Sequence, residues 1–152
     1  MRFERLERQH VEECTYGYIL TFQEEQWSYE RAHMRLSDFV AAPRFIGYVA
    51  YDNDHFVGAA FCHEVVGALD NKLVIDEFFI VPAYQRLSHG SELLDVIHRY
   101  AASNHLRTTT LVTEAEDAKL DFYIQSGFTV GENHAFLRKD VADNPALFSE
   151  HQ

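Results

Sequence analysis

Residues 73–94, LVIDEFFIVPAYQRLSHGSELL, decide the fold of this chain. They open with β-branched and aromatic residues, interrupted only by Asp76 and Glu77, which predicts a strand. Pro82 ends the run, because proline has no N–H group to donate to a neighbouring strand. A polar turn follows, and apolar residues then recur at helical spacing: Leu93, Leu94, Ile97 and Ala101. The stretch therefore predicts a strand, a loop and a helix whose N-terminus faces the loop, which suits an anion such as a phosphate-bearing cofactor.

The amino-acid composition limits the classes of function that the chain can have. The 152 residues fit a single domain, and 47% hydrophobic with 24% charged residues is ordinary for a globular protein. With 13 basic and 24 acidic side chains the formal net charge is −11, which argues against nucleic-acid binding. The acidic surplus favours a cationic substrate, although it also keeps many proteins in solution.

Cysteines, histidines and apolar runs indicate a setting without disulfides, metals or a membrane. Cys14 and Cys62 lie far apart with no CxxC motif, so we expect a reduced, cytoplasmic protein. No signal peptide is evident, and no apolar run approaches the roughly 18 residues of a membrane span. Nine histidines, His63 and His89 among them, could titrate near neutral pH but lack the paired spacing of a metal site.

The remaining periodicity predicts one α/β (α+β) domain over residues 1–140, followed by a tail, 141–152. We expect two amphipathic helices after an N-terminal edge strand, the second one capped by Ser28 and closed by Pro43. We then expect three antiparallel strands at 45–51, 56–66 and 73–81, a helix at 90–104, and a strand at 108–113 that is parallel to the third. A helix at 115–126, which Gly127 is placed to end in a left-handed conformation, and a terminal hairpin at 128–139 follow. The sheet is therefore expected to be mixed, mostly antiparallel and six- to seven-stranded, with about four helices.

Two motifs carry a family resemblance. Gln85-Arg86-Leu87-Ser88-His89-Gly90 occupies the place of a Q/R-x-x-G-x-G/A cofactor loop, and Phe122-Tyr123-Ile124-Gln125-Ser126-Gly127-Phe128 looks like an F-Y-x-x-x-G-F signature. Together with the element order, they resemble the GNAT superfamily of N-acetyltransferases over nearly the whole chain. The resemblance implies acetyl-CoA as cosubstrate, no metal, direct sequential transfer to an amine, and a homodimer of the kind common among relatives.

The resemblance also implies where acetyl-CoA lies. The pantetheine arm would run along Phe79, Ile80 and Val81, and the pyrophosphate would lie over a loop of seven residues: Gln85, Arg86, Leu87, Ser88, His89, Gly90 and Ser91. Arg86 and Ser88 depart from the family, which usually has glycines there. Glycine permits a positive φ and a close approach of the backbone to the pyrophosphate.

Transfer requires an acid for the departing thiolate and a base for the amine. Tyr123 matches the signature tyrosine, which implies contact with the cofactor and the role of acid. Asp76 and Glu77 are the candidates for the base. Successive strand residues point to opposite faces, so both acids reach one cleft only if a bulge intervenes. Similarity to spermidine/spermine acetyltransferases favours Asp76 as base and Glu77 as a partner for the substrate's charge, whereas in the alternative one acid simply faces solvent.

The acceptor is expected to be a small cationic amine, a polyamine or an aminoglycoside. Residues 22–27 form a polar patch flanked by aromatics, which is either a helix–helix corner or one wall of the acceptor site, with Glu24 and Trp27 as substrate contacts. Two alternatives stay open. One is a protein or peptide N-acetyltransferase, and the other is a non-catalytic acyl-CoA-binding module.

Overall fold

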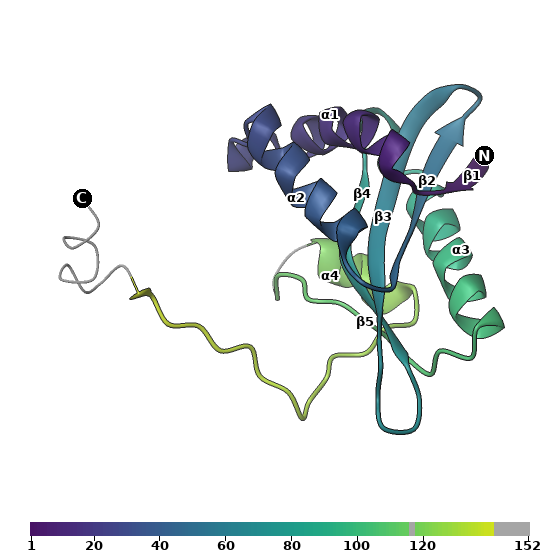
Figure 1. Ribbon diagram of the computed structural model, residues 1–152, viewed down its shortest axis with the longest axis vertical. Coiled ribbons are helices and arrows are strands. Elements are labelled where there is room, and N and C mark those ends of the chain that lie inside the picture. The colour runs from purple at the N-terminus through teal and green to yellow at the C-terminus, as the bar shows by residue number, and fades with distance from the viewer. Residues whose placement is uncertain (116–117, 142–152) are drawn as a thin grey trace. The chain divides into compact units, whose positions relative to one another are not determined.

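A mixed sheet organises the first part of the chain, and its strands run in the order β1-β2-β3-β4-β5 in the computed structural model (Figure 1). β4 and β5 are parallel, and every other neighbouring pair is antiparallel. The strands are β1 Arg2–Arg5, β2 Phe45–Asp52, β3 His55–Val65, β4 Lys72–Ile80 and β5 Thr109–Thr110. The structure describes residues 1–115 and 118–141.

Helices connect these strands where the apolar periodicity predicts them. The α-helices are α1 Val11–Thr21, α2 Tyr29–Ala41, α3 His89–Ser103 and α4 Ala118–Gln125, and short 3₁₀ turns are η1 Arg8–His10, η2 Gln23–Glu25 and η3 Pro82–Tyr84. Ser28 caps α2 as expected, because its hydroxyl oxygen accepts a hydrogen bond from the Arg31 N–H at 3.1 Å. None of the helices in the described residues is long and apolar enough to cross a membrane.

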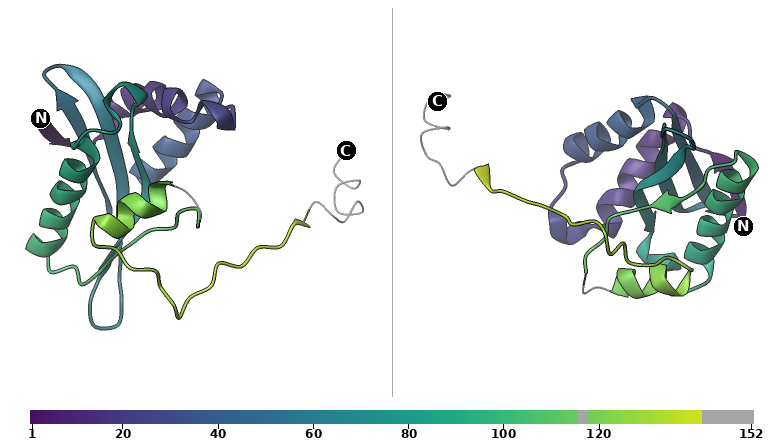
Figure 2. Two further views of the ribbon diagram at one scale, coloured as in Figure 1. Left: turned by 180° about the vertical axis from the view of Figure 1, so that it is seen from behind. Right: turned by 90° about the horizontal axis from the view of Figure 1, so that it is seen from below.

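The sheet separates α1 and α2 from α3 (Figure 2). Phe61 of β3 belongs to the apolar core that α1 and α2 cover. Glu64, three residues later on β3, points to the other face, where it accepts a hydrogen bond from Tyr100 of α3. This alternation is the two-residue period of a strand, and it fixes which side chains of β3 and β4 face α1 and α2.

The chain divides into two compact units, Met1–Thr113 and Glu114–Gln152. The second unit holds α4, whose end is marked by Gly127 at a φ of 102°. A left-handed glycine is a common way to end a helix, so this part of the sequence prediction is confirmed. Most of the predicted tail, 142–152, lies outside the described residues.

The predicted fold class is confirmed, but the predicted strand number is wrong: the described sheet has five strands instead of six or seven. Residues 128–130 and 135–139 do not form the expected hairpin, and Phe136 and Leu137 are exposed. The predicted strand at 108–113 is also reduced to Thr109 and Thr110. A strand of two residues offers too short an edge to organise further pairing.

Candidate active site

A β-bulge interrupts β4 at Asp76. Phe61 of β3 lies opposite Glu77, whereas Cys62 lies opposite Ile75, so Asp76 is an extra residue without a partner on β3. Such a bulge rotates the strand and changes the face to which the following side chains point.

The bulge places both acids on the face that α1 and α2 cover. His63 points to the same face as Phe61, because β3 alternates without interruption between them. Asp76 is hydrogen-bonded to His63, and Glu77 is hydrogen-bonded to Tyr18 of α1. The condition that the sequence set for Asp76 and Glu77 to line one cleft is therefore met.

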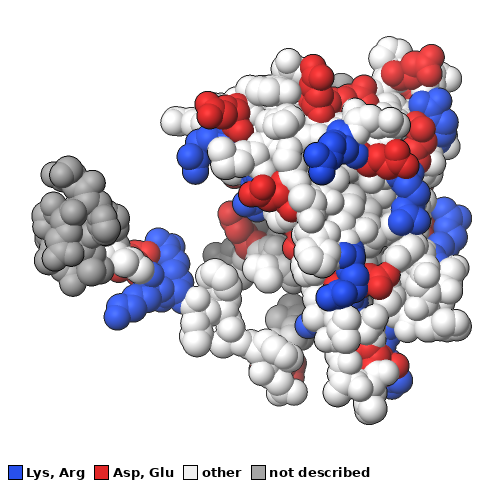
Figure 3. Space-filling view, viewed as in Figure 1, with Lys and Arg blue, Asp and Glu red and all other residues white. Residues whose placement is uncertain are grey.

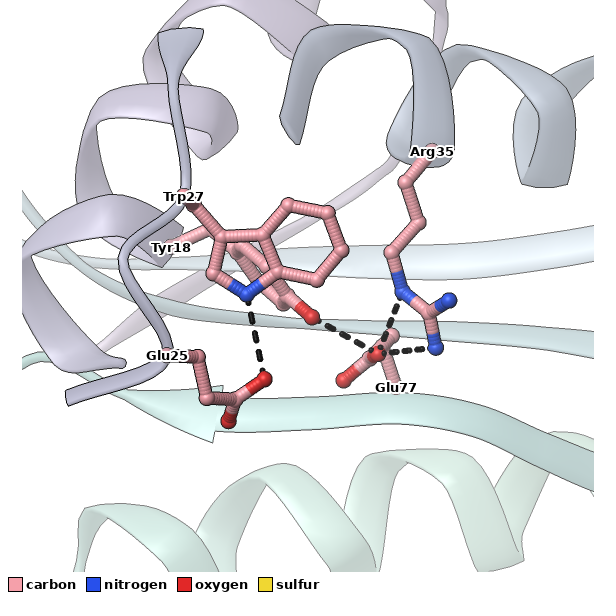
Figure 4. Close-up of polar contacts among 5 residues, drawn as sticks. All are labelled: Tyr18, Glu25, Trp27, Arg35 and Glu77. Atoms are coloured by element: carbon pink, nitrogen blue, oxygen red, sulfur yellow. Dashed lines mark hydrogen bonds and ion pairs between the residues drawn. The ribbon is translucent and has the colours of Figure 1, made fainter. Parts of the chain in front are cut away.

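One carboxylate oxygen of Glu77 accepts two hydrogen bonds and forms an ion pair (Figure 4). The Tyr18 hydroxyl donates to this Oε1 at 3.0 Å and Arg35 Nε of α2 donates to it at 2.9 Å, while Arg35 Nη2 lies 2.8 Å away. Only 13% of the Glu77 side chain is exposed, against 42% for Arg35. The charge of Glu77 is thus compensated by Arg35, a partner that the sequence did not predict.

Electrostatics keep Tyr18 and Arg35 as donors in this cluster. Burial raises the pKa of Tyr18 above its ordinary value, and the nearby charge of Glu77 adds to the shift. Burial alone would lower the pKa of Arg35, but its bonds to Glu77 raise it. Both side chains therefore stay protonated around neutral pH.

Asp76 pairs with His63 at 2.6 Å, from Oδ2 to Nδ1. Of these two side chains His63 is the more exposed, at 32% against 21% for Asp76. The buried Cys62 thiol lies on the opposite face of β3, where burial, and then the charge of Asp76, raise its pKa and keep it unreactive.

The segment between α1 and α2 supplies a tryptophan wall. Trp27 donates its indole N–H to Glu25 at 3.1 Å, and the Arg35 guanidinium lies 5.7 Å from the centre of its ring (Figure 4). Glu24, the acid that the sequence favoured for this wall, is exposed on η2. Beside Trp27, an open groove of about 290 Å³ follows α2, lined also by Arg31, Met34, Arg35, Asp38 and Phe39.

The other edge of β4 is open beyond its first residues. Among the described residues of the first unit, β5 pairs only with Leu73 and Val74. The edge from Ile75 through Phe79 to Ile80 therefore has no β5 partner. At its end, the Gln85 side chain turns back and donates to the Ile80 carbonyl at 2.7 Å, and the Val81 N–H donates to Val57.

The predicted phosphate loop enters α3 in an unusual conformation. Arg86 has a φ of 64°, in the left-handed region where glycine is favoured. Leu87 is exposed beside it. Ser88 is the N-cap of α3, but its hydroxyl donates to the Glu92 carboxylate at 3.0 Å rather than capping a backbone N–H. Gly90 and Ser91 lie in the first turn of the helix.

His89 opens α3 with an unsatisfied ring atom. Its Nδ1 is buried and has no hydrogen-bond partner among the described residues. The ring contacts Tyr84 at 5.5 Å between centroids. Buried polar atoms without a partner are rare in folded proteins, so this corner is one where a bound group could complete the hydrogen bonding.

Tyr123 lies on α4 in the second unit. Its ring contacts Phe122 at 5.2 Å and Phe128 at 5.6 Å, and its carbonyl accepts the Phe128 N–H at 3.0 Å. The aromatic and glycine positions of the predicted signature thus form one local cluster around the end of α4.

Comparison with known proteins decides the family. The sequence profile of the acetyltransferase (GNAT) family matches residues 8–128. The chain belongs to the GNAT acetyltransferase family. The predicted enzyme class, an N-acetyltransferase, is thereby confirmed. No curated protein sequence matches the chain.

Solved structures share the GNAT fold at low identity. An aminoglycoside acetyltransferase, meta-AAC0020, from an uncultured soil metagenomic sample, in complex with sisomicin, has a TM-score of 0.76 at 15% identity, covering 92% of this chain and 95% of that one. Aminoglycoside N-acetyltransferase AAC(6')-Iy, in complex with CoA, has a TM-score of 0.72 at 14% identity, covering 91% and 93%. A ribosomal-protein-alanine N-acetyltransferase from Brucella melitensis biovar Abortus 2308 has a TM-score of 0.76 at 8% identity, covering 92% and 100%.

The sequence did not predict which residues contact Asp76 and Glu77 in this GNAT protein. Nothing in the local sequence around Tyr18 or Arg35 indicates that both side chains reach Glu77. His63 was noted only as a group able to titrate. The signal for its pairing with Asp76 is the bulge, which depends on the register of two strands and not on a local pattern.

Proposed function

We propose that this protein transfers the acetyl group of acetyl-CoA directly to a primary amine of a small molecule. The observation that carries the proposal is the bulge at Asp76. It gathers Asp76 and Glu77 on one face of the sheet, next to the point where β4 is no longer paired with β5. An open strand edge can hold the extended arm of acetyl-CoA. The titratable side chains beside that edge can then exchange protons with the reacting groups.

The proposed cofactor site follows β4 to the start of α3. The unpaired edge around Phe79, Ile80 and Val81 offers backbone groups to the amides of a pantetheine arm. The pyrophosphate would lie over the loop Gln85–Ser91, where the first N–H groups of α3 and the side chains of Arg86 and His89 favour an anion. The side-chain bonds of Gln85 and Ser88 already tie this loop to β4 and to Glu92.

The transfer conserves atoms and charge. The amine nitrogen forms a bond to the thioester carbonyl carbon, and the bond from that carbon to sulfur breaks. The nitrogen loses a proton to a base on the face that carries Asp76, and the departing thiolate gains one. In this proposal the phenol of Tyr123 supplies that proton, as its match to the family's signature tyrosine implies.

We place the acceptor in the groove along α2, against Trp27. A small cationic amine of the polyamine or aminoglycoside kind is the proposed class, supported by the net charge of −11. Acidic and basic side chains are nevertheless interspersed on the face in Figure 3. The groove also carries Arg31 and Arg35 besides Asp38, so its walls do not select a polycation by charge alone.

A thiol-release assay tests the proposed function. Acetyl-CoA is mixed with spermidine, an aminoglycoside, an arylalkylamine or a peptide with a free N-terminus, and free CoA is followed. Release with small amines supports the proposal. Release with the peptide alone would make the chain a protein N-acetyltransferase, and release with none of them would favour an acyl-CoA-binding module.

Two further expectations accompany the proposed function. Cys14 and Cys62 are both buried and unpaired, which supports a reducing, cytoplasmic compartment. A homodimer is expected by analogy with the family, and sedimentation analysis of the full chain would measure it.

A further inference from the structure

We infer that His63 is the group that takes the proton from the acceptor amine, and that Asp76 is a positioning residue that fixes the orientation of its ring. This inference rests on the proposed function and assigns a role in it to a residue that neither the sequence motifs nor the family resemblance singles out. It replaces Asp76 acting directly as base.

The geometry favours the imidazole over the carboxylate as the proton acceptor. The bond of 2.6 Å joins Asp76 Oδ2 to His63 Nδ1, so a proton on Nδ1 leaves the lone pair of Nε2 free to accept another. His63 is also the more exposed of the two, at 32% against 21%. A carboxylate beyond an imidazole that fixes its tautomer is the arrangement by which several enzymes prepare a histidine base.

The position of the pair fits the reactive end of the cofactor arm. From Val81, next to the proposed phosphate loop, to Asp76, β4 spans about 17 Å at 3.4 Å per residue. That span is comparable to an extended pantetheine arm, whose thioester would then lie close to the bulge. β5 ends its pairing at Val74, just beyond this point.

The chemistry also favours an imidazole. An acceptor amine is mainly an ammonium ion in neutral water, and it must lose a proton before its nitrogen can attack. Free imidazole titrates at about 6.5 and free carboxylate at about 4, so imidazole is the stronger base of the two side-chain types. His63 Nε2 takes a proton from the ammonium ion, and the neutral amine then attacks the thioester carbon. The second proton that the nitrogen loses balances the one that the departing thiolate gains, and His63 passes its own proton to water after the product leaves.

Within residues 1–115 and 118–141, the neighbours that strand pairing and hydrogen bonds place beside the pair are uncharged or have their charge compensated. Glu77 is the next residue on β4, and its charge is compensated by Arg35 of α2 and by the hydroxyl of Tyr18 from α1. From β3, Cys62 lies on the opposite face and its pKa is raised by burial. The side chain of β2 opposite His63 is Phe45, which carries no charge.

An isosteric substitution separates a base from a structural partner. His63→Asn keeps a donor near the position of Nδ1, so the bond to Asp76 and the bulge are retained, while the atom that would accept the proton is removed. We expect kcat to fall by about 10²–10⁴-fold with the KM for acetyl-CoA unchanged, and imidazole in the buffer to restore part of the rate to His63→Gly. His55→Gln, at the exposed start of β3, is the control and should retain the wild-type rate.

The tautomer of His63 gives a readout independent of activity. Nitrogen-15 NMR of the full chain at neutral pH should show the proton on Nδ1, and Asp76→Asn should reduce this preference and lower kcat. A proton on Nε2 would overturn the inference, as would a His63→Asn variant with wild-type kcat and an unchanged acidic limb of the pH profile. If the wild-type chain transfers acetyl to no amine, the proposed function fails instead, whatever the tautomer.

Discussion

Arg35 holds both Nε and Nη2 on a single oxygen of Glu77, at 2.9 and 2.8 Å. The pair joins α2 to β4 directly beside the bulge, and Tyr18 adds a hydrogen bond from α1. The acid that the sequence favoured as a free partner for a cationic acceptor is thus already balanced by a cation of the protein. The contact orients Arg35, which lines the groove along α2, and it balances the charge of Glu77 within the protein.

Removing Arg35 should destabilise the protein. Arg35→Met leaves Glu77, whose side chain is only 13% exposed, without its cation. We expect the free energy of unfolding to fall by about 1–3 kcal/mol, the usual penalty for a charged group that loses its hydrogen-bond partner. Arg31→Met is the matched control, one turn earlier and exposed on the same helix, and should change stability by no more than about 0.5 kcal/mol. Urea denaturation of both variants provides the measurement, and equal effects would mean that the pair contributes nothing.

The conformation of Arg86 makes a separate prediction. A left-handed residue other than glycine costs about 1–2 kcal/mol, against about 0.5–1 kcal/mol for the extra entropy that glycine loses. Arg86→Gly should therefore raise stability by up to about 1 kcal/mol, while the lost guanidinium weakens acetyl-CoA binding. Arg44→Gly is the control, because Arg44 has a φ of 58° but lies outside the loop. It should gain stability and keep its affinity in calorimetry, and equal affinities in the two variants would exclude Arg86 from the cofactor site.

The proposed acid is tested by Tyr123→Phe. The substitution removes only a hydroxyl group, so the fold and the affinity for acetyl-CoA should persist. Turnover should slow by about 10²–10⁴-fold, the usual contribution of a positioned proton donor. Single-turnover kinetics with a good acceptor would check this, and a variant with wild-type turnover would mean that another group or water protonates the thiolate.

Stability at high pH should reflect the bond between Tyr100 and Glu64. Burial, and then this hydrogen bond, raise the pKa of Tyr100 to about 12. The unfolded chain releases this proton near its ordinary value of about 10, so the contribution to stability is complete below about pH 10 and is lost as the pH rises towards 12. Tyr100→Phe should lose less stability over this range than the wild type does. Tyr16→Phe, exposed on α1, is the control and should follow the wild type.

A cationic acceptor predicts salt dependence. The Debye length is about 10 Å at 0.1 M salt, so the KM for spermidine should rise with ionic strength, whereas that for a neutral-bodied arylalkylamine should not. Glu77→Gln should raise the spermidine KM further, because it leaves Arg35 as an unpaired cation in the groove. A preference for the arylalkylamine without salt dependence would contradict the cationic acceptor and leave the acetyl transfer intact.

Most of the fold could be predicted from local patterns in the sequence. The strand at 73–81, the cap at Ser28 and the left-handed Gly127 all follow from the chemistry of single residues, and the structure confirms each of them. The prediction of a terminal hairpin was wrong because the residue pattern at 128–139 also suits an exposed extended segment. Whether such a segment joins a sheet depends on a partner edge, and β5 offers only Thr109 and Thr110.

The site was less accessible to sequence reasoning, because its contacts join distant residues. A bulge was recognised as the condition for Asp76 and Glu77 to share a face, but its position depends on the register of β3 against β4. The contact of Arg35 with Glu77 spans 42 residues, and that of Tyr18 spans 59. No local pattern specifies either of them.

In the proposed mechanism, acetyl transfer to a small amine takes place at the bulge around Asp76. The most direct test measures free CoA and N-acetylated amine together, in one reaction of the wild-type chain with acetyl-CoA and spermidine or an aminoglycoside, and repeats it with Asp76→Asn. Equal amounts of both products are expected for the wild type, and a rate at least about tenfold lower is expected for Asp76→Asn at unchanged cofactor affinity. CoA released without acetylated amine, or an Asp76→Asn variant as fast as the wild type, would contradict the proposed mechanism.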